Sequence, residues 1–291
     1  MANKKKKSTG IKKKFMKRWK KTGIYKYYKK NKKTFNSIVI VLLILIAVFL
    51  IGRTVRQITE KTNYGIDVSQ YQENINWSEV REDGLSYVFI RCGGRSYGEN
   101  GVLIYDPMFK KNFREARARG FDTGVYFYSQ AINKKEAIEE AEFCLTVLDG
   151  RSLQLPVYID VEYSGAGNGR ADNLSRAERT EVVEAFCKVI SDAGYKPGVY
   201  SNRYFLEENL ELTSPALKDV SVWLAEYHNG SKPGYKGDYD FWQYTSEGEV
   251  SGIKGNVDLN RCNPEKPRVK ETPIKGKNIK VEKKQENKKV K

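Results

Sequence analysis

The chain has 291 residues, with 52 Lys and Arg, 36 Asp and Glu and a formal net charge of +16. The excess lies in one place, because residues 1–33 contain 16 basic and no acidic side chains. Residues 34–264 carry 25 basic and 32 acidic side chains, and residues 265–291 carry 11 and 4. A nucleic-acid-binding fold places its positive charge on the folded surface. We therefore expect no binding to nucleic acid.

The composition also argues against metal and thiol-redox chemistry. His228 is the single histidine, which excludes a zinc site built from several imidazoles. The cysteines, Cys92, Cys144, Cys187 and Cys262, lie at least 43 residues apart, so no Cys-x-x-Cys pair exists. We expect no metal and no other cofactor. The cysteines are either disulfide-bonded, with three possible pairings, or buried free thiols, and the sequence favours neither.

The first predicted elements are a basic arm, residues 1–36, and an apolar segment, residues 37–53, which is uncharged as far as Gly52. A membrane-spanning helix needs about 17 to 25 residues, so this segment is near the short limit. A secretory signal peptide is the alternative, but the basic region is long for one and no small-x-small cleavage site follows. The basic flank predicts a cytoplasmic N-terminus and an extracytoplasmic body, and it also suits anionic lipid.

After a predicted linker, residues 54–63, the body occupies residues 64–263. Apolar and β-branched runs predict eight strands, at 64–68, 87–92, 124–129, 156–162, 198–201, 220–227, 241–244 and 257–260. Helical patterns lie between the earlier strands, at 77–83, 107–119, 134–148, 176–193 and about 204–209. Asn133 with Glu136, and Ser175 with Glu178, have the spacing of helix N-terminal caps.

Five alternations of strand and helix followed by strands alone predict an α/β fold, an irregular (β/α)5(β)3 TIM-like barrel. A doubly wound open sheet is the alternative architecture. The last segment, residues 264–291, lacks periodicity and is rich in Lys, so we expect a flexible basic tail.

The candidate acids interrupt three of the predicted strands. Asp160 and Glu162 alternate along one strand and therefore project to the same side. Asp67 and Asp258 interrupt the first and last strands, which are neighbours in a barrel, so all four acids can converge. Repulsion between such carboxylates raises one pKa and produces a general acid. A cluster of acids without His or Cys suits glycosidic bond cleavage, whereas a salt-bridged or solvated pair is the structural alternative.

Aromatic side chains accompany the acids on several predicted strands. Sugar rings stack on such side chains, and their collective placement favours a carbohydrate groove, although each one alone is more often a core residue. The aromatic candidates for substrate binding are Tyr126, Tyr128, Trp223, Tyr227, Trp242 and Tyr244.

Six stretches of this sequence resemble glycoside hydrolase family 25, the Chalaropsis-type lysozymes, in order and across nearly all of residues 64–263. They are GIDVSQ at 65–70, GVYFYSQ at 124–130, VYIDVE at 157–162, WLAEY at 223–227, FWQYTS at 241–246 and GNVDLN at 255–260. The resemblance implies a barrel of five helices and eight strands. It also implies cleavage of the β-1,4 bond between N-acetylmuramic acid and N-acetylglucosamine in peptidoglycan.

Carried over by these motifs, Glu162 is the acid that protonates the leaving oxygen. Asp160 orients the N-acetyl group of the substrate or stabilises positive charge, and Asp67 and Asp258 complete the acidic pocket. We also expect Arg91 and Gln243 to contact the substrate. The outcome at the anomeric carbon stays open, with a preference for retention assisted by the acetamido group.

Two other functions remain as alternatives. Gly94-Arg-Ser96-Tyr-Gly98 matches the Gly-x-Ser-x-Gly elbow of esterases, with Asp160 and His228 following in the required order, but no helix start follows Ser96. The second alternative is an inactive, membrane-tethered protein that binds or scaffolds the cell wall.

Overall fold

The computed structural model describes residues 16–61, 63–165 and 167–266. The first 15 residues of the predicted basic arm, Thr62 of the predicted linker and most of the predicted tail lie outside the described residues. The chain divides into two compact units, Met1–Thr59 and Glu60–Lys291.

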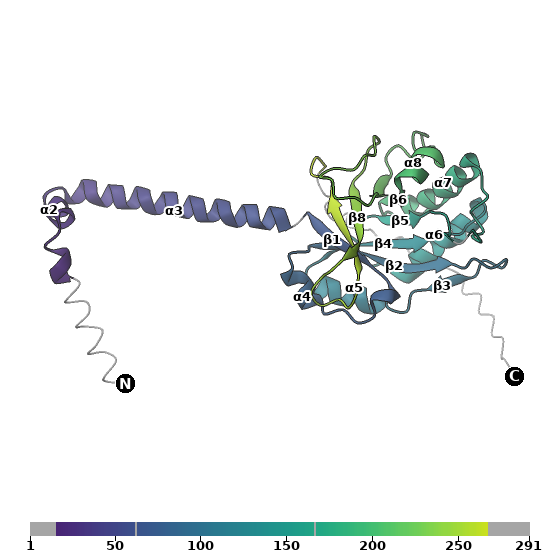
Figure 1. The fold of residues 1–291 in the computed structure, drawn as a ribbon, viewed down its shortest axis with the longest axis horizontal. Helices are drawn as coiled ribbons and strands as arrows, with labels where there is room; N and C mark the ends of the chain where they lie inside the picture. Colours follow the sequence, from purple (N-terminus) through teal and green to yellow (C-terminus); the bar gives the residue numbers. More distant parts are fainter. Residues whose placement is uncertain (1–15, 62, 166, 267–291) are drawn as a thin grey trace. The chain divides into compact units, whose positions relative to one another are not determined.

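The first unit contains helices α2 (Gly23–Lys30) and α3 (Lys32–Lys61), shown in Figure 1. The side chain of Thr22 caps α2 by accepting a hydrogen bond from the amide of Tyr25. Among the described residues, α3 is the one helix long and apolar enough to cross a membrane, over the 21 residues Lys32–Gly52. It begins before the predicted span 37–53 and continues through most of the predicted linker.

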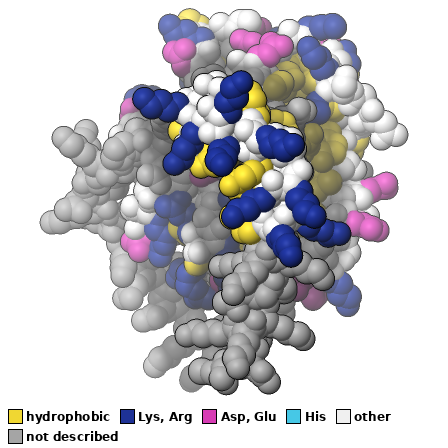
Figure 2. Space-filling view, turned by 90° about the vertical axis from the view of Figure 1, so that its left-hand side faces the viewer, with side chains coloured by type: hydrophobic (Ala, Val, Ile, Leu, Met, Phe, Trp, Pro, Cys, Tyr) yellow, Lys and Arg dark blue, Asp and Glu magenta, His cyan; other side chains and the backbone are white. Residues whose placement is uncertain are grey.

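The part of the first unit around α2 combines aromatic and basic side chains. Trp19 packs edge-on against Tyr25 with ring centroids 5.0 Å apart, and Tyr28 packs against Phe35 of α3 at 5.2 Å. Residues 16–36 contain nine Lys and Arg and no acid. Figure 2 shows these basic side chains gathered around exposed apolar ones.

The second unit is built on a sheet that closes on itself. Its strands are β1 (Tyr64–Val68), β2 (Tyr87–Arg95), β3 (Leu103–Tyr105), β4 (Asp122–Tyr128), β5 (Val157–Asp160), β6 (Pro197–Asn202), β7 (Ser221–Ala225), β8 (Phe241–Gly248) and β9 (Val257–Cys262). They pair in the order β1-β9-β8-β7-β6-β5-β4-β2-β3, and β1 also pairs with β2. Eight strands therefore form a barrel, with β3 outside it. The barrel prediction is confirmed, and the open-sheet alternative is wrong.

Strand direction accounts for the absence of a helix between β8 and β9, although the parallel strands β7 and β8 are also joined without a helix. All neighbouring barrel strands from β1 through β8 are parallel, whereas β9 is antiparallel to both β8 and β1. Antiparallel neighbours need only a short connection, so no crossover helix is required between them. The pairing of β9 with β1 places Asp67 directly opposite Asp258.

Helices cover the earlier strands, as Figure 1 shows. They are α4 (Trp77–Glu82), α5 (Phe109–Ala118), α6 (Lys134–Leu148), α7 (Arg176–Asp192) and α8 (Arg203–Glu208), with a short 3-10 helix, η1, at Gln70–Gln72. The side chain of Asn133 caps α6 by accepting from the amide of Glu136, and Ser175 with Glu178 forms a capping box at α7. Both predicted caps are confirmed.

Aromatic side chains fill the inside of the barrel. Phe89 and Trp223 lie with ring centroids 4.4 Å apart, and Tyr158 packs edge-on against Phe89 at 5.1 Å. Gly198 makes room for this cluster, since a Cβ there would lie 2.3 Å from the Tyr158 ring. Tyr158 precedes Asp160 by two residues on β5, so the aromatic cluster forms the layer beneath the acid.

The four cysteines are all buried free thiols in the structure. Cys92 on β2 and Cys144 on α6 face each other, with their sulfur atoms 3.5 Å apart. Of the two alternatives left open by the sequence, the structure contains the thiol form.

Candidate active site

The four acids selected from the sequence, together with Asp106, line one cavity of about 610 Å³, called the acidic cavity here. Asp67 extends from β1 and Asp258 from the paired position of β9. Asp160 is the last residue of β5, and Glu162 follows two residues later. All four acids selected from the sequence therefore meet in one place, at the carboxyl end of β5.

Burial is the largest cause of a raised pKa at each of these carboxyl groups. It raises the pKa of Asp67 well above its usual value, with the charge of Asp258 adding to the effect. The pKa of Asp160 is also well above its usual value, because burial and the nearby charges of Glu162 and Asp67 outweigh the attraction of Arg91. Burial and the charge of Asp258 raise the pKa of Glu162 to about 7, and burial raises the pKa of Asp258. Glu162 thus holds a proton near neutral pH, as a general acid must.

Hydrogen bonds fix the orientation of Asp67. Its Oδ2 accepts from Gln243 Nε2 at 2.9 Å and from Asn260 Nδ2 at 2.7 Å. Gln243 Oε1 in turn accepts from the hydroxyls of Tyr200 at 2.8 Å and Tyr227 at 2.7 Å. Donors to a carboxylate favour its charged form and oppose the effect of burial.

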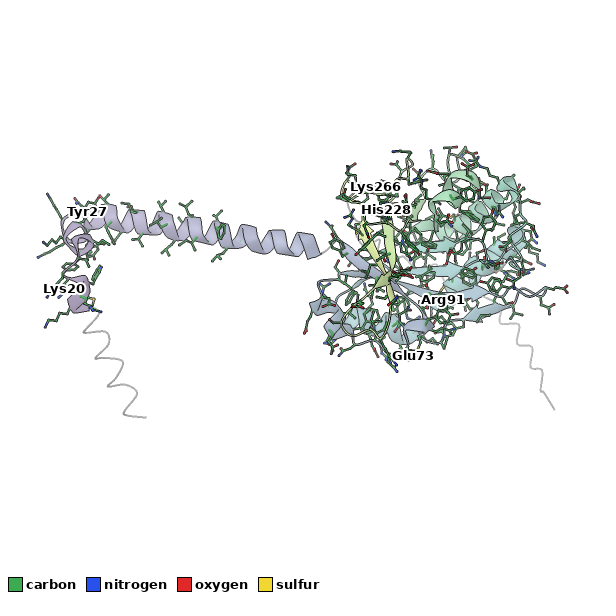
Figure 3. All side chains as sticks on the ribbon, viewed as in Figure 1. Lys20, Tyr27, Glu73, Arg91, His228 and Lys266 are labelled. Carbon is green, nitrogen blue, oxygen red and sulfur yellow. The ribbon has the colours of Figure 1, made fainter. Side chains whose placement is uncertain are left out.

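Arg91, labelled in Figure 3, lines the acidic cavity from β2, the strand next to β1. Its Nε donates to Asp106 Oδ2 at 2.9 Å, and the same oxygen accepts from the backbone amide of Gln70. The guanidinium carbon lies 4.9 Å from the ring centroid of Tyr71, which is 74% exposed at the rim. Arg91 is thus held in position by an ion pair and a cation–π contact, on the strand next to that of Asp67.

Aromatic residues form the floor and one rim of the acidic cavity. Trp223 is buried, packs edge-on against Tyr126 with ring centroids 5.7 Å apart, and donates its indole N–H to Asn260 Oδ1 at 2.7 Å. Tyr128 Oη lies 2.9 Å from Tyr97 Oη in an edge-on pair. Trp223 is therefore part of the floor, and the tyrosines are better placed to contact a ligand.

Two predicted substrate contacts lie elsewhere. Trp242 and Tyr244 flank Gln243 on β8 and line a second cavity of about 640 Å³, called the outer hollow here. The Trp242 indole donates to the backbone carbonyl of Glu226 at 2.8 Å. The outer hollow is lined in part by Tyr64, Tyr227, His228, Trp242, Tyr244 and Arg261. Tyr227 is shared, because it also lines the acidic cavity.

The esterase arrangement is wrong. Ser96 and Asp160 line the acidic cavity, whereas His228 lines the outer hollow. The chain after Ser96 turns into β3 rather than into a helix, and Ser96 Oγ accepts from the amide of Val102 at 2.9 Å. His228 Nδ1 accepts from the amide of Gly230 at 2.8 Å, so no Ser–His pair exists for nucleophilic attack.

The sequence reasoning did not select several residues of the acidic cavity and its network. Tyr200 and Asn260 both lie on strands, so strand alternation could have indicated them. Asn260, for example, lies two residues after Asp258 on the same strand face. Tyr71, Tyr97 and Asp106 lie in connections whose path no periodicity reveals.

The acidic cavity has the composition of a site for acid–base chemistry. In the part of the chain that the structure describes, no group of His, Cys, Asp and Glu is arranged to hold a metal ion. Carboxyl groups with raised pKa values, beside exposed tyrosines, are typical of sites for glycoside hydrolysis.

Comparison with known proteins identifies the family. Residues 66–253 match Glycosyl hydrolases family 25. The chain belongs to this family. It is therefore a glycoside hydrolase of the lysozyme class, which confirms the enzyme type expected from the sequence motifs.

Individual relatives agree with this assignment. The chain is 31% identical over 209 residues to uncharacterized protein YegX of Escherichia coli K12, covering 69% of this chain and 70% of that protein. It is 30% identical over 196 residues to the autolytic lysozyme of Clostridium acetobutylicum, covering 67% and 54%. The modular autolysin LytC of Streptococcus pneumoniae, solved with a synthetic peptidoglycan ligand, matches at 27% identity and a TM-score of 0.57, covering 68% and 46%.

Proposed function

We propose that this family 25 glycoside hydrolase is a membrane-anchored muramidase that cleaves the β-1,4 bond between N-acetylmuramic acid and N-acetylglucosamine. The observation that carries the proposal is the acidic cavity, in which Glu162 has a pKa raised to about 7 beside the buried Asp67 and Asp160 and the half-buried Asp258. The relatives named as lysozymes and the peptidoglycan-bound autolysin support the same substrate class.

Glu162 is the proposed general acid. As the glycosidic bond breaks, its carboxyl proton transfers to the leaving oxygen, and the resulting carboxylate then accepts a proton from the incoming water. Burial keeps that proton in place near pH 7, whereas an exposed Glu would be ionised.

Asp160 is the proposed partner of the substrate acetamido group. Its Oδ1 is buried without a hydrogen-bond partner among the described residues, so it is available to accept the N–H of an N-acetyl group. Such a contact directs the acetamido oxygen toward the anomeric carbon and favours retention of configuration. Asp67 and Asp258, on the other side of the cavity, stabilise the positive charge that develops on the sugar ring.

The sugar rings are proposed to contact the exposed rim tyrosines and the fixed Arg91. Tyr128 and Tyr227 present edges and hydroxyls into the acidic cavity. Tyr126 and Gln243 act from the wall, and Trp242 and Tyr244 contact only the part of the substrate that reaches the outer hollow.

The catalytic assignment is tested on purified peptidoglycan with the full chain in detergent. Wild type should release fragments with N-acetylmuramic acid at the reducing end, and Glu162→Gln should lower kcat by about 10³-fold because the acid proton is lost. Glu82→Gln, an exposed change on α4, is the matched control and should leave kcat unchanged.

Other outcomes would overturn parts of this proposal. Fragments ending in N-acetylglucosamine would contradict the bond assignment, and full activity in Glu162→Gln would contradict the acid. An inactive wild type that still sediments with peptidoglycan would favour a wall-binding role instead.

We also propose that α3 anchors the enzyme, with the N-terminus in the cytoplasm and the barrel outside. The apolar stretch Lys32–Gly52 supports a single membrane span. The basic residues around α2 support contact with anionic lipid on the cytoplasmic side.

Protease added to intact cells tests the topology. The barrel should be digested and a tag at residue 1 protected. Protection of the barrel would overturn the orientation, and a secreted product lacking residues 1–53 would favour a cleaved signal peptide.

A further inference from the structure

The outer hollow lies where the barrel has no helical cover. The connections from β7 to β8 and from β8 to β9 contain no helix. Trp242 and Tyr244 project from β8 on the face opposite Gln243, and Arg261 of β9 pairs with both Trp242 and Tyr64. The volume of about 640 Å³ is in the range of small-molecule sites.

The outer hollow continues from the acidic cavity across Tyr227. This side chain is 54% exposed and lines both spaces, while its hydroxyl donates to Gln243 inside the barrel. A substrate whose glycan occupies the acidic cavity can therefore extend a substituent over Tyr227 without leaving the protein surface.

Arg261 supplies a positive charge that pairs with no carboxylate of the described residues. Its guanidinium carbon lies 4.9 Å from the centroid of the Trp242 ring, and its Nη2 donates to the backbone carbonyl of Ser231. No ion pair involves Arg261 among the described residues. A guanidinium held against an aromatic face retains donors for a carboxylate.

The remaining charges of the outer hollow are few. Glu247 is exposed and is the single acid of the lining, also without an ion pair among residues 63–165 and 167–266. The His228 ring lies 5.3 Å from Trp242, with Nε2 3.8 Å from Glu226 Oε1. A cation and an anion beside aromatic rings suit a ligand that bears a carboxylate, an amine and short apolar side chains.

We propose that the outer hollow binds the stem peptide that substitutes N-acetylmuramic acid, with Arg261 pairing with a peptide carboxylate and Glu247 with the side-chain amine of its diamino acid. The inference rests on the proposed muramidase function. The stem peptide leaves the glycan through the lactyl ether of the muramic acid, next to the scissile bond. Its free carboxylates, its amine and its alanine methyl groups match the cation, the acid and the aromatic rings that line the outer hollow.

Binding is tested with the full chain in detergent and the tetrapeptide L-Ala-γ-D-Glu-L-Lys-D-Ala, followed by saturation-transfer NMR of the peptide signals. Wild type should show saturable binding, and Arg261→Gln should weaken it about ten-fold through loss of a charge-assisted contact. Lys232→Gln is the matched control, because Lys232 is an exposed cation outside both cavities. No binding by wild type, or equal binding by Arg261→Gln, would overturn the proposal.

The contribution of Glu247 is tested with the same peptide after acetylation of its lysine amine. Glu247→Gln should weaken binding of the free-amine peptide several-fold and leave the acetylated peptide unaffected. An equal effect on both peptides would overturn the amine contact.

Kinetics separate a binding role of Arg261 from a structural one. On glycan strands that retain their peptides, Arg261→Gln should lower kcat/KM about ten-fold, and on strands stripped by an amidase it should change kcat/KM less than two-fold. An equal loss on both substrates would overturn the proposal. If wild type cleaved neither strand yet bound the tetrapeptide through Arg261, the muramidase function would fail and the peptide site would stand.

Discussion

The two faces of strands β8, β9 and β1 differ in a way that the helix-covered strands do not. On their inner face lie Asp67, Gln243 and Asp258, which belong to the acidic cavity. On their outer face lie Tyr64, Tyr244 and Arg261, which line the outer hollow, together with Trp242, which lines it but is itself buried. Strand β4 is different, because its outward Val125 and Phe127 are fully buried under helices and serve the core alone.

This comparison shows what the missing helices make possible. On a strand that a crossover helix covers, the side chains that point inward line the site and those that point outward join the core. Where no helix covers it, alternate side chains divide into two surfaces that can both meet a ligand. Tyr227 joins these surfaces at the end of β7, so one polymeric substrate can engage both.

The sharpest contrast between the two faces is expected in their pH dependence. Only the acidic cavity, which the inner face lines, contains a carboxyl group that must be protonated, that of Glu162 after β5. With the pKa of Glu162 near 7, kcat/KM should fall as pH rises above 7 and the acid loses its proton, reaching about 50-fold below the pH 7 value at pH 9. Initial rates on peptide-free glycan strands between pH 5 and pH 9 measure this fall in kcat/KM.

The residual activity of Glu162→Gln serves as the control for that profile. Because Gln does not titrate, the fall above pH 7 should be absent in this variant. A fall of the same size in both proteins would assign the titration to another group.

Much of the fold was predictable because it rests on local signals. The caps at Asn133 and Ser175, and the alternation of strands with amphipathic helices, were enough to place α6 and α7 and to indicate a barrel. The strand β3 was missed because its three residues are too few for a periodic pattern. The closed sheet itself is a long-range property, and only the pairing of β1 with β2 and β9 established it.

The candidate site was predictable to a different degree for acids and aromatics. An acid within an apolar strand, such as Asp67, stands out because burying a charged group costs free energy. An acid in such a position therefore indicates a functional role. An aromatic residue in a strand carries no such signal, since it fits a core, a floor or a rim equally well. Trp242 and Gln243 are adjacent and share one motif. Because successive side chains of a strand point to opposite faces, Trp242 lines the outer hollow and Gln243 lines the acidic cavity. Contacts such as Arg91 with Tyr71 depend on loop paths that the sequence does not specify.

A smaller effect is expected from the network that orients Asp67 on the inner face. Asn260 is fully buried, donates to Asp67 and accepts from Trp223. Asn260→Ala removes a donor that favours the ionised form of Asp67 and leaves a buried indole N–H without its acceptor. We expect kcat on peptide-free strands to fall about ten-fold, KM to change less than two-fold, and the protein to lose about 1–3 kcal/mol of stability.

Asn229→Ala is the matched change on the other side, because Asn229 is exposed and lines the outer hollow. It should leave kcat and the thermal midpoint within error on the same strands. A positioning role requires that kcat of Asn260→Ala falls while KM holds, because the substrate still binds but meets a misoriented carboxylate. Equal changes in kcat and KM would contradict a positioning role of Asn260. Equal effects of the two alanine variants would show that Gln243 alone is enough to hold Asp67.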